Sequence, residues 1–296
     1  MKYRILGKSG LEVSVIGIGT WQFGGEWGMS FSQPDVDTLL GHARELGINL
    51  VDAEERYGDH LSEKLIGQAL RHSRKEWIIA TKFGHHFHGP FNRTTHWQPD
   101  EAVRSVEESL RALQTDTIDL LQFHSGPDEV FDNEALWKSL QNLVQSGKVR
   151  YLGISIGRND NIHQTSLASQ FGASTIQVVY NRLDTTPEDK VFPSCLEQNL
   201  GVLARVPLAS GLLSGKYHPG DTFTDPRDIR SRRDPADIQQ QLKRVDQIRL
   251  HEVPEGIPMA RWALSWCLKH PAVTCVIPGN KTVEQVESNA LAADLI

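Results

Sequence analysis

Ile176-Gln-Val-Val-Tyr180 is an almost wholly apolar run in the second half of the chain. Runs of this kind are typical of strands that are buried on both faces, as in parallel sheets. Including this run, the sequence predicts eight strands, over Ile16–Thr20, Ile48–Asp52, Trp77–Lys82, Ile118–His124, Val149–Ile156, Thr175–Asn181, Val202–Leu208 and Thr274–Pro278. These strands indicate a large, mainly parallel sheet.

A candidate helix follows each predicted strand. Gln33–Glu45, for example, places Val36, Leu39, Leu40 and Ala43 at helical spacing. The other candidates are Ser62–Leu70, Pro99–Leu113, Asn133–Ser146, Ile162–Phe171, Pro193–Asn199, Pro258–Leu268 and Thr282–Ala292. Eight strands that each precede a helix are the signature of a (β/α)₈ barrel.

Two further segments add to this repeating pattern. Tyr3–Leu6 and Leu11–Val15 flank a Gly-Lys-Ser-Gly turn, which predicts a short hairpin that could plug the lower end of the barrel. A long polar loop, Lys216–Gln240, is expected after the seventh strand, either as a solvated loop or as a lid over a ligand. We expect residues 1–296 to form a single barrel domain.

Composition excludes several classes of protein. Among 296 residues, 31 Lys and Arg against 37 Asp and Glu give a net charge of −6, which argues against nucleic acid or an anionic membrane surface as partner. Cys195, Cys267 and Cys275 have the spacing of neither a disulfide framework nor a zinc site. We find neither a signal peptide nor an apolar run of membrane-spanning length, so we expect a cytoplasmic protein.

Four polar side chains fall where barrel active sites gather, at the C-terminal ends of the strands. Asp52, Lys82 and His124 end the second, third and fourth predicted strands, and Tyr57 follows Asp52 in the next loop. A nearby ammonium would lower the pKa of a tyrosine from its usual value near ~10, and a carboxylate would hold that ammonium in place. A histidine can orient a carbonyl oxygen or assist proton transfer. The set suits protonation of an oxygen as it becomes an alkoxide.

Several short motifs occur in order along the chain. They are Leu6-Gly-Lys-Ser-Gly10, Ile18-Gly-Thr-Trp21, Asp52-Ala-Glu-Glu-Arg-Tyr57-Gly58, Ile79-Ala-Thr-Lys82, Asp119-Leu-Leu-Gln-Phe-His124, Ser146–Ser155, Gln177-Val-Val-Tyr-Asn181, Pro207–Lys216 and Ile277-Pro-Gly-Asn-Lys281. In this order the chain resembles the aldo-keto reductases essentially from end to end. The resemblance implies a carbonyl reductase with Tyr57 as general acid, Lys82 and Asp52 tuning it, and His124 orienting the carbonyl.

The resemblance also implies a nicotinamide cofactor held without a Rossmann domain, and the sequence contains no GxGxxG motif. Ser155 and Gln177 would hold the carboxamide, the loop from Leu208 to Lys216 would wrap the pyrophosphate, and Lys281 would meet a 2′-phosphate. We therefore expect NADPH, with NADH as a weaker alternative. The full set of expected cofactor contacts is Gly19, Thr20, Trp21, Asp52, Ser155, Gln177, Arg205, Leu208, Ser210, Leu212, Ser214, Lys216, Gly279, Lys281, Gln285 and Asn289.

The chain departs from the family pattern at a few positions. Ala53 and Glu54 replace the usual threonine and alanine after the aspartate, which places an extra carboxylate beside the site. Ile156 replaces an asparagine that contacts the carboxamide, and Arg205 stands where an aromatic residue commonly stacks on the nicotinamide. A planar guanidinium can also stack on a ring.

Two other functions remain open on sequence alone. A cofactor-binding regulatory subunit, of the kind associated with channels, would keep the fold without turnover. The histidines His85, His86, His88 and His96 could form a metal site of a barrel hydrolase, but no acidic ligand pattern accompanies them, and we expect no metal. Aromatic residues in the first two rim loops suggest a pocket for an apolar or ring-bearing carbonyl: Trp21, Trp27, Phe31, Phe87, Phe91 and Trp97.

Overall fold

The computed structural model describes residues 1–296. Eight strands form one parallel sheet, in which neighbours follow the order β12-β11-β10-β9-β8-β5-β4-β3. Their bounds are β3 (Ile18–Gly19), β4 (Leu50–Asp52), β5 (Ile78–Phe83), β8 (Ile118–His124), β9 (Val149–Ser155), β10 (Ala173–Val179), β11 (Gly201–Arg205) and β12 (Val273–Ile277). Isolated parallel bridges, Ile16 with Val276 and Gly19 with Gly279, join the first strand to the last. The predicted (β/α)₈ barrel is confirmed.

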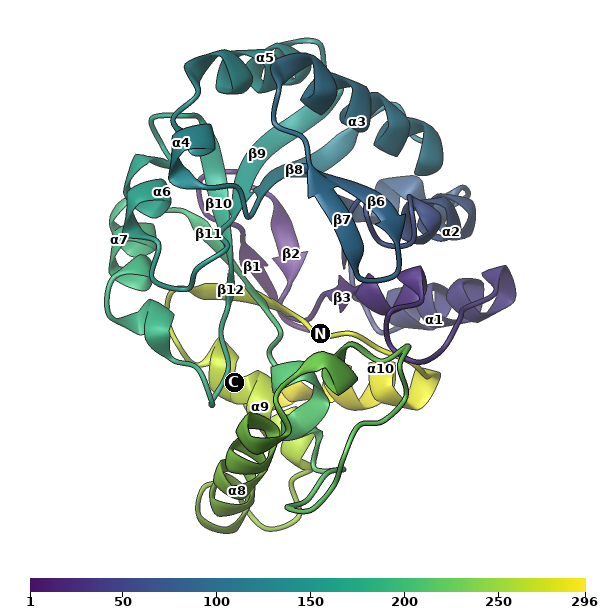
Figure 1. Ribbon diagram of the computed structural model, residues 1–296, viewed down its shortest axis with the longest axis vertical. Coiled ribbons are helices and arrows are strands. Elements are labelled where there is room, and N and C mark those ends of the chain that lie inside the picture. The colour runs from purple at the N-terminus through teal and green to yellow at the C-terminus, as the bar shows by residue number, and fades with distance from the viewer.

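Helices form a ring around the strands (Figure 1). Their bounds are α1 (Gln33–Glu45), α2 (Leu61–Leu70), α3 (Pro99–Ala112), α4 (Asp128–Phe131), α5 (Glu134–Gln145), α6 (Ile162–Leu167), α7 (Val191–Glu197), α8 (Pro235–His251), α9 (Met259–Leu268) and α10 (Val283–Ala290). Capping boxes at Ser32 and Gln98, each with a proline in the first turn, start α1 and α3. No helix combines the length and apolar character needed to cross a bilayer.

The strands are buried on both faces, as their composition predicts. All seven residues of β8 are buried, because one face meets the helices and the other fills the barrel. At the seam between β3 and β12, a Cβ on Gly19 would lie 2.7 Å from the Ile277 carbonyl oxygen. Glycine at this position therefore allows the barrel to close.

Besides the one-turn helix α4, two larger elements were not predicted. An antiparallel hairpin of β6 (His85–Gly89) and β7 (Asn92–Thr95) follows β5, where we expected a loop. The polar loop after β11 is present, but it ends at Pro235, where α8 begins. Asp234 caps this helix, and its buried Ile238, Leu242 and Val245 pack in a satellite apolar cluster. The expected seventh strand also stops early, at Arg205, because Val206 has a left-handed φ of 55° and a proline follows it.

The N-terminal hairpin closes the lower end of the barrel, as predicted. β1 (Tyr3–Ile5) and β2 (Glu12–Ser14) pair antiparallel. Leu6, Leu11 and Val13 from this hairpin pack in one buried cluster with residues of five barrel strands, namely Leu50, Ala80, Leu120, Leu203, Cys275 and Ile277. The hairpin therefore fills the barrel interior opposite the ends where β4, β5 and β8 carry the polar residues.

We expect Leu6→Ala to destabilise the protein by about 2–5 kcal/mol, because it leaves a cavity in this fully buried cluster. Urea unfolding followed by circular dichroism measures the change. Ile5→Ala is the matched control, since Ile5 is 56% exposed and should cost well under half as much. Equal losses in the two variants would contradict the role of the hairpin as a plug.

Candidate functional site

The four residues expected to be catalytic lie together at the C-terminal rim of the barrel. Asp52 ends β4, Lys82 lies in β5, His124 ends β8, and Tyr57 follows β4 in a short loop. All four are buried, with exposed fractions of 3%, 1%, 7% and 9% for Asp52, Lys82, His124 and Tyr57. The rim therefore brings a carboxylate, an ammonium, an imidazole and a phenol into one enclosed region.

Lys82 and Asp52 form the centre of a hydrogen-bonded layer across the barrel. Lys82 Nζ lies 2.7 Å from Asp52 Oδ2 and also donates to the Ala53 carbonyl at 2.8 Å. The other carboxylate oxygen, Oδ1, accepts from the amides of Gln122 at 3.1 Å and Gln177 at 2.8 Å. These contacts leave the ion pair with partners on both of its carboxylate oxygens.

Tyr57 is held between aromatic and charged groups. Its ring stacks on Trp21 with centroids 6.2 Å apart, and Lys82 Nζ lies 5.4 Å from its centroid. Burial, followed by the charges of Glu54 and Asp52, raises the pKa of Tyr57 well above its usual value. The net lowering of this pKa that we expected is therefore wrong: burial and the two carboxylates outweigh the opposite effect of the Lys82 ammonium.

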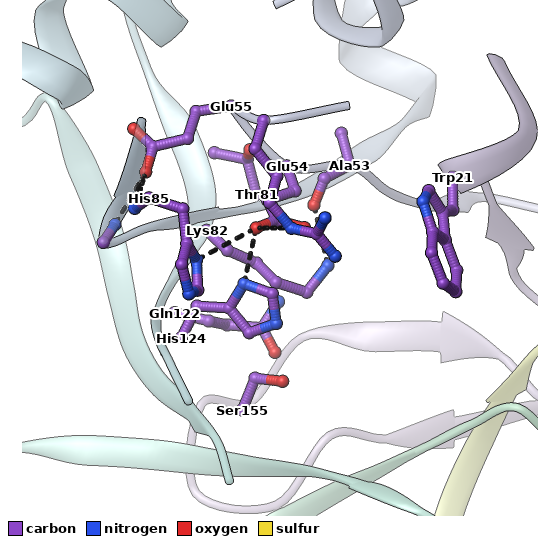
Figure 2. Close-up of polar contacts among 12 residues, drawn as sticks. Trp21, Ala53, Glu54, Glu55, Thr81, Lys82, His85, Gln122, His124 and Ser155 are labelled. Atoms are coloured by element: carbon purple, nitrogen blue, oxygen red, sulfur yellow. Dashed lines mark hydrogen bonds and ion pairs between the residues drawn. The ribbon is translucent and has the colours of Figure 1, made fainter. Parts of the chain in front are cut away.

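That second carboxylate, Glu54, has three nitrogen atoms close to one of its oxygens. Its Oε1 lies 2.6 Å from His124 Nδ1, 3.3 Å from His85 Nδ1 and 3.0 Å from Arg56 Nε. Figure 2 shows His85 and His124 both directed at Glu54. Oε2 is buried and has no hydrogen-bond partner. Glu54 is thus a central member of the site rather than a residue at its edge.

The ionisation states of this group follow from burial and charge. Burial alone would raise the pKa of Glu54, but interactions with His124 and Arg56 outweigh it and hold this pKa well below its usual value. Burial also lowers the pKa of His124, against the opposing effect of Glu54. With His124 neutral, Glu54 still has a charged partner in Arg56, whose Nε lies 3.0 Å from Oε1, and we assign an ionised Glu54 and a neutral His124 on this geometry.

Arg56 connects this group to the loop that follows β3. Its guanidinium lies 3.8 Å from Glu26 Oε2, which also accepts from the Trp21 indole at 2.5 Å. The other oxygen of Glu26 accepts from the backbone of Phe91, in the turn of the β6–β7 hairpin. Two rim loops are therefore held by one buried glutamate.

Glu55 positions the start of the β6–β7 hairpin. Its Oε1 accepts from the backbone N–H groups of Gly84 at 2.7 Å and His85 at 2.6 Å, and Ser105 of α3 donates to Oε2. Figure 2 shows this carboxylate beside the backbone near His85. These bonds place His85 next to Glu54.

The expected carboxamide contacts lie on the adjacent strands β9 and β10. Ser155 and Gln177 are register partners, and their side chains are 3.5 Å apart. Arg205, at the end of β11, donates to the Ile156 carbonyl at 3.1 Å, while its Nε is buried without a partner. An unpaired buried donor of this kind fits a position that a ligand completes.

The loop expected to wrap a pyrophosphate forms a 3-10 segment, Ala209–Ser214, with left-handed φ angles at Ala209, Ser210 and Gly211. Leu212 is fully buried in the α8 cluster, so its side chain packs against protein and does not face a ligand. Leu208, Ser214 and Lys216 lie in or beside the same segment.

The residues expected at the adenosine end lie just before and within α10. Lys281 donates from its backbone to Gln285, and its Nζ donates to the Trp27 carbonyl at 2.8 Å. Asn289 donates to Asn280 at 2.7 Å. Gly279 and Gly19, with Thr20 and Trp21 following, flank the seam between β12 and β3. The structure therefore places the expected cofactor contacts in neighbouring rim segments.

The long loop after β11 packs against these segments. Asp228 forms a bridge with Trp27, and Arg230 lies 5.6 Å from the Trp27 ring and 4.1 Å from the Phe223 ring. Arg232 lies 4.4 Å from the Phe91 ring. Part of the loop thus adjoins the rim, rather than extending wholly into solvent.

The predicted histidine cluster divides in two. Ligand atoms of His85, His124 and Glu54 lie within 4.8 Å of one another. His124 Nδ1 forms a hydrogen bond with Glu54 Oε1, and His85 Nδ1 lies 3.3 Å from the same oxygen without a hydrogen bond. His86 packs on His96 with ring centroids 3.8 Å apart, and His88 contacts Thr94. Our expectation that the site needs no metal remains a prediction.

Sequence reasoning missed four members of the site: Glu26, Glu55, Arg56 and Gln122. Glu55 and Arg56 lie inside the motif that contains Tyr57, and Gln122 lies two residues before His124 on the same strand. The inward-facing alternation of β8 is the signal that would have identified Gln122.

Comparisons with known proteins agree with this geometry. The model of the Aldo/keto reductase family matches residues 15–295. An uncharacterised oxidoreductase of Bacillus subtilis, YqkF, is 31% identical, covering 99% of this chain and 92% of its own length. The holo form of aldo-keto reductase AKR11C1 from Bacillus halodurans has a TM-score of 0.83 and 31% identity, over 99% of this chain and 91% of that one.

One further relative carries a cofactor in its name. Aldo-keto reductase yakc [NADP(+)] of Schizosaccharomyces pombe is 29% identical, covering 94% of this chain and 83% of its own length. Because the family model and these relatives cover nearly the whole chain, the protein belongs to the aldo/keto reductase family and is an oxidoreductase of that family.

Proposed function

We propose that this protein is an NADPH-dependent reductase that converts aldehyde or ketone carbonyls to alcohols. The observation that carries the proposal is the buried Lys82–Asp52 pair beside Tyr57, at the rim where barrel enzymes do their chemistry. Membership of the family supplies the reaction type. A small-molecule carbonyl compound is the partner we propose.

In this proposal Tyr57 is the general acid. Its raised pKa keeps the hydroxyl protonated at neutral pH, so that it can give up the proton only as negative charge develops on the substrate oxygen. The Lys82 ammonium, fixed by Asp52 and the Ala53 carbonyl, stabilises the phenolate left behind. His124 borders the same space and orients the substrate.

A reduced nicotinamide dinucleotide supplies the hydride when bound. The chain offers groups that fit such a ligand: the unpaired buried Nε of Arg205, the Ser155–Gln177 pair, and cations at Lys216 and Lys281. Burial is the largest cause that lowers the pKa of Lys281, and the positive charge of Arg230 is the next. An anion that neutralised them would be stabilised here, and this favours a 2′-phosphate and hence NADPH.

Turnover is the first test. We expect the purified protein to oxidise NADPH with members of an aldehyde and ketone panel, followed by absorbance of the reduced nicotinamide. Cofactor binding without turnover of any carbonyl would contradict the reductase and favour the regulatory subunit instead.

Tyr57→Phe should lower kcat by at least about 10²-fold, because it removes the proton donor and keeps the stacked ring. Affinity for NADPH, measured by fluorescence titration, should stay within about twofold, since the hydroxyl does not hold the cofactor. A large loss of affinity would show that Tyr57 has a different role.

Lys281→Ala should weaken NADPH binding by about tenfold or more and NADH binding much less, because only NADPH carries the phosphate that this ammonium would pair with. Isothermal titration with each cofactor measures both affinities. Lys138→Ala, an exposed lysine on α5, is the control and should change neither. Equal losses for both cofactors in Lys281→Ala would refute the phosphate contact.

A further inference from the structure

His124 uses only one of its ring nitrogens inside the protein. Nδ1 lies 2.6 Å from Glu54 Oε1, and Nε2, on the other edge of the ring, makes no hydrogen bond with the protein. In Figure 2 the ring lies with one edge toward Glu54. The free nitrogen is therefore the one available to a substrate.

The charge on Glu54 decides which nitrogen carries the proton. An ionised carboxylate can only accept a hydrogen bond, so the short contact requires a proton on Nδ1. Arg56 at 3.0 Å balances the carboxylate, and Glu26 in turn lies 3.8 Å from Arg56. The other ionisable groups around His124 are His85 and Lys82. Both disfavour a positive charge on the His124 ring. A neutral ring with Nδ1–H presents a lone pair at Nε2.

A lone pair is a poor neighbour for a carbonyl oxygen, which also brings lone pairs. It is a good neighbour for a hydroxyl group, which brings a donor. The carbonyl oxygen can take the single proton of Tyr57, and a hydroxyl on the adjacent carbon can donate to His124. Both groups would then be satisfied by one small molecule.

We propose that Glu54 turns Nε2 of His124 into a hydrogen-bond acceptor, so that the site selects carbonyl compounds with a hydroxyl group on the neighbouring carbon. The inference rests on the proposed reductase function and specifies its substrate class. Glu54 acts through His124 and is a positioning residue.

The pocket wall supports a hydroxylated substrate over the apolar one expected from the aromatic residues. Trp97 is partly buried, with its ring 4.9 Å from Phe123 and 5.8 Å from His85. Trp21 bonds to the buried Glu26, and the Arg56 guanidinium lies 5.7 Å from the Trp21 and Tyr57 rings. Charged groups therefore lie directly behind the aromatic surface.

The kinetic test compares two ketones of equal size, hydroxyacetone and butanone, which differ by a hydroxyl in place of a methyl group. We expect the wild type to favour hydroxyacetone in kcat/KM by about tenfold or more, since a site built to receive a hydroxyl rejects its analogue. In Glu54→Ala the neutral imidazole can move its proton to Nε2, and the preference should fall at least fivefold. The two ketones also differ in intrinsic reactivity. Comparing the kcat/KM ratio of the wild type with that of Glu54→Ala removes this difference.

Two variants guard against a merely structural effect. Glu54→Gln keeps the volume and removes the charge, and it should shift the ratio in the same direction as alanine. Glu63→Gln is the matched control. Glu63, on α2, is also fully buried, and its carboxylate lies 2.5 Å from His60 Nδ1. It should leave the ratio unchanged.

The tautomer itself can be measured without turnover. Nitrogen-15 shifts of labelled protein, with the His124 signals assigned from a His124→Gln variant, should show Nδ1–H in the wild type and in Glu63→Gln, and a shift toward Nε2–H in Glu54→Ala. Nε2–H in the wild type, or an equal preference for the two ketones in wild type and Glu54→Ala, would overturn the inference. Failure to reduce any carbonyl would instead overturn the proposed function.

Discussion

The buried ion pair of Lys82 and Asp52 is the interaction on which the upper half of the barrel depends. Removing two charges from water costs several kcal/mol per ion unless the pair is close and its remaining atoms are hydrogen-bonded. Here the pair is 2.7 Å apart, and amides of Gln122 and Gln177 take the second carboxylate oxygen. Strands β4, β5, β8 and β10 are thus tied together by one polar layer.

That layer divides the barrel interior into two parts with different tasks. Below it, the N-terminal hairpin and the lower strand residues form an apolar cluster that contributes packing. Above it, loops carry Tyr57, Trp21 and the β6–β7 hairpin next to the buried polar residues. Stability and chemistry are therefore separated along the barrel axis, so rim loops can vary without loss of the core.

The sequence predicts the parts of this arrangement that follow from periodicity. The barrel strands are apolar on both faces, and their ends place Asp52, Lys82 and His124 on one rim. Contacts between rim side chains leave no repeating pattern in the sequence. Glu54 and His124, for example, are 70 residues apart and come together only when the barrel closes. Helix α8 was missed because its buried stripe is narrow and lies among glutamine and charged residues, as in a solvated loop. The β6–β7 hairpin has almost no apolar alternation that could indicate strands.

Glu54 shows how a single departure from a family pattern requires others. A carboxylate where the family usually has alanine would be an uncompensated buried charge on its own. Arg56 compensates it, and the guanidinium, itself largely enclosed, is compensated by Glu26 from a different loop. The three residues therefore form a linked set, and replacing any one leaves a buried charge without its partner. Because the same carboxylate raises the pKa of Tyr57 and binds Nδ1 of His124, this set acts on both groups that meet the substrate in the proposed mechanism.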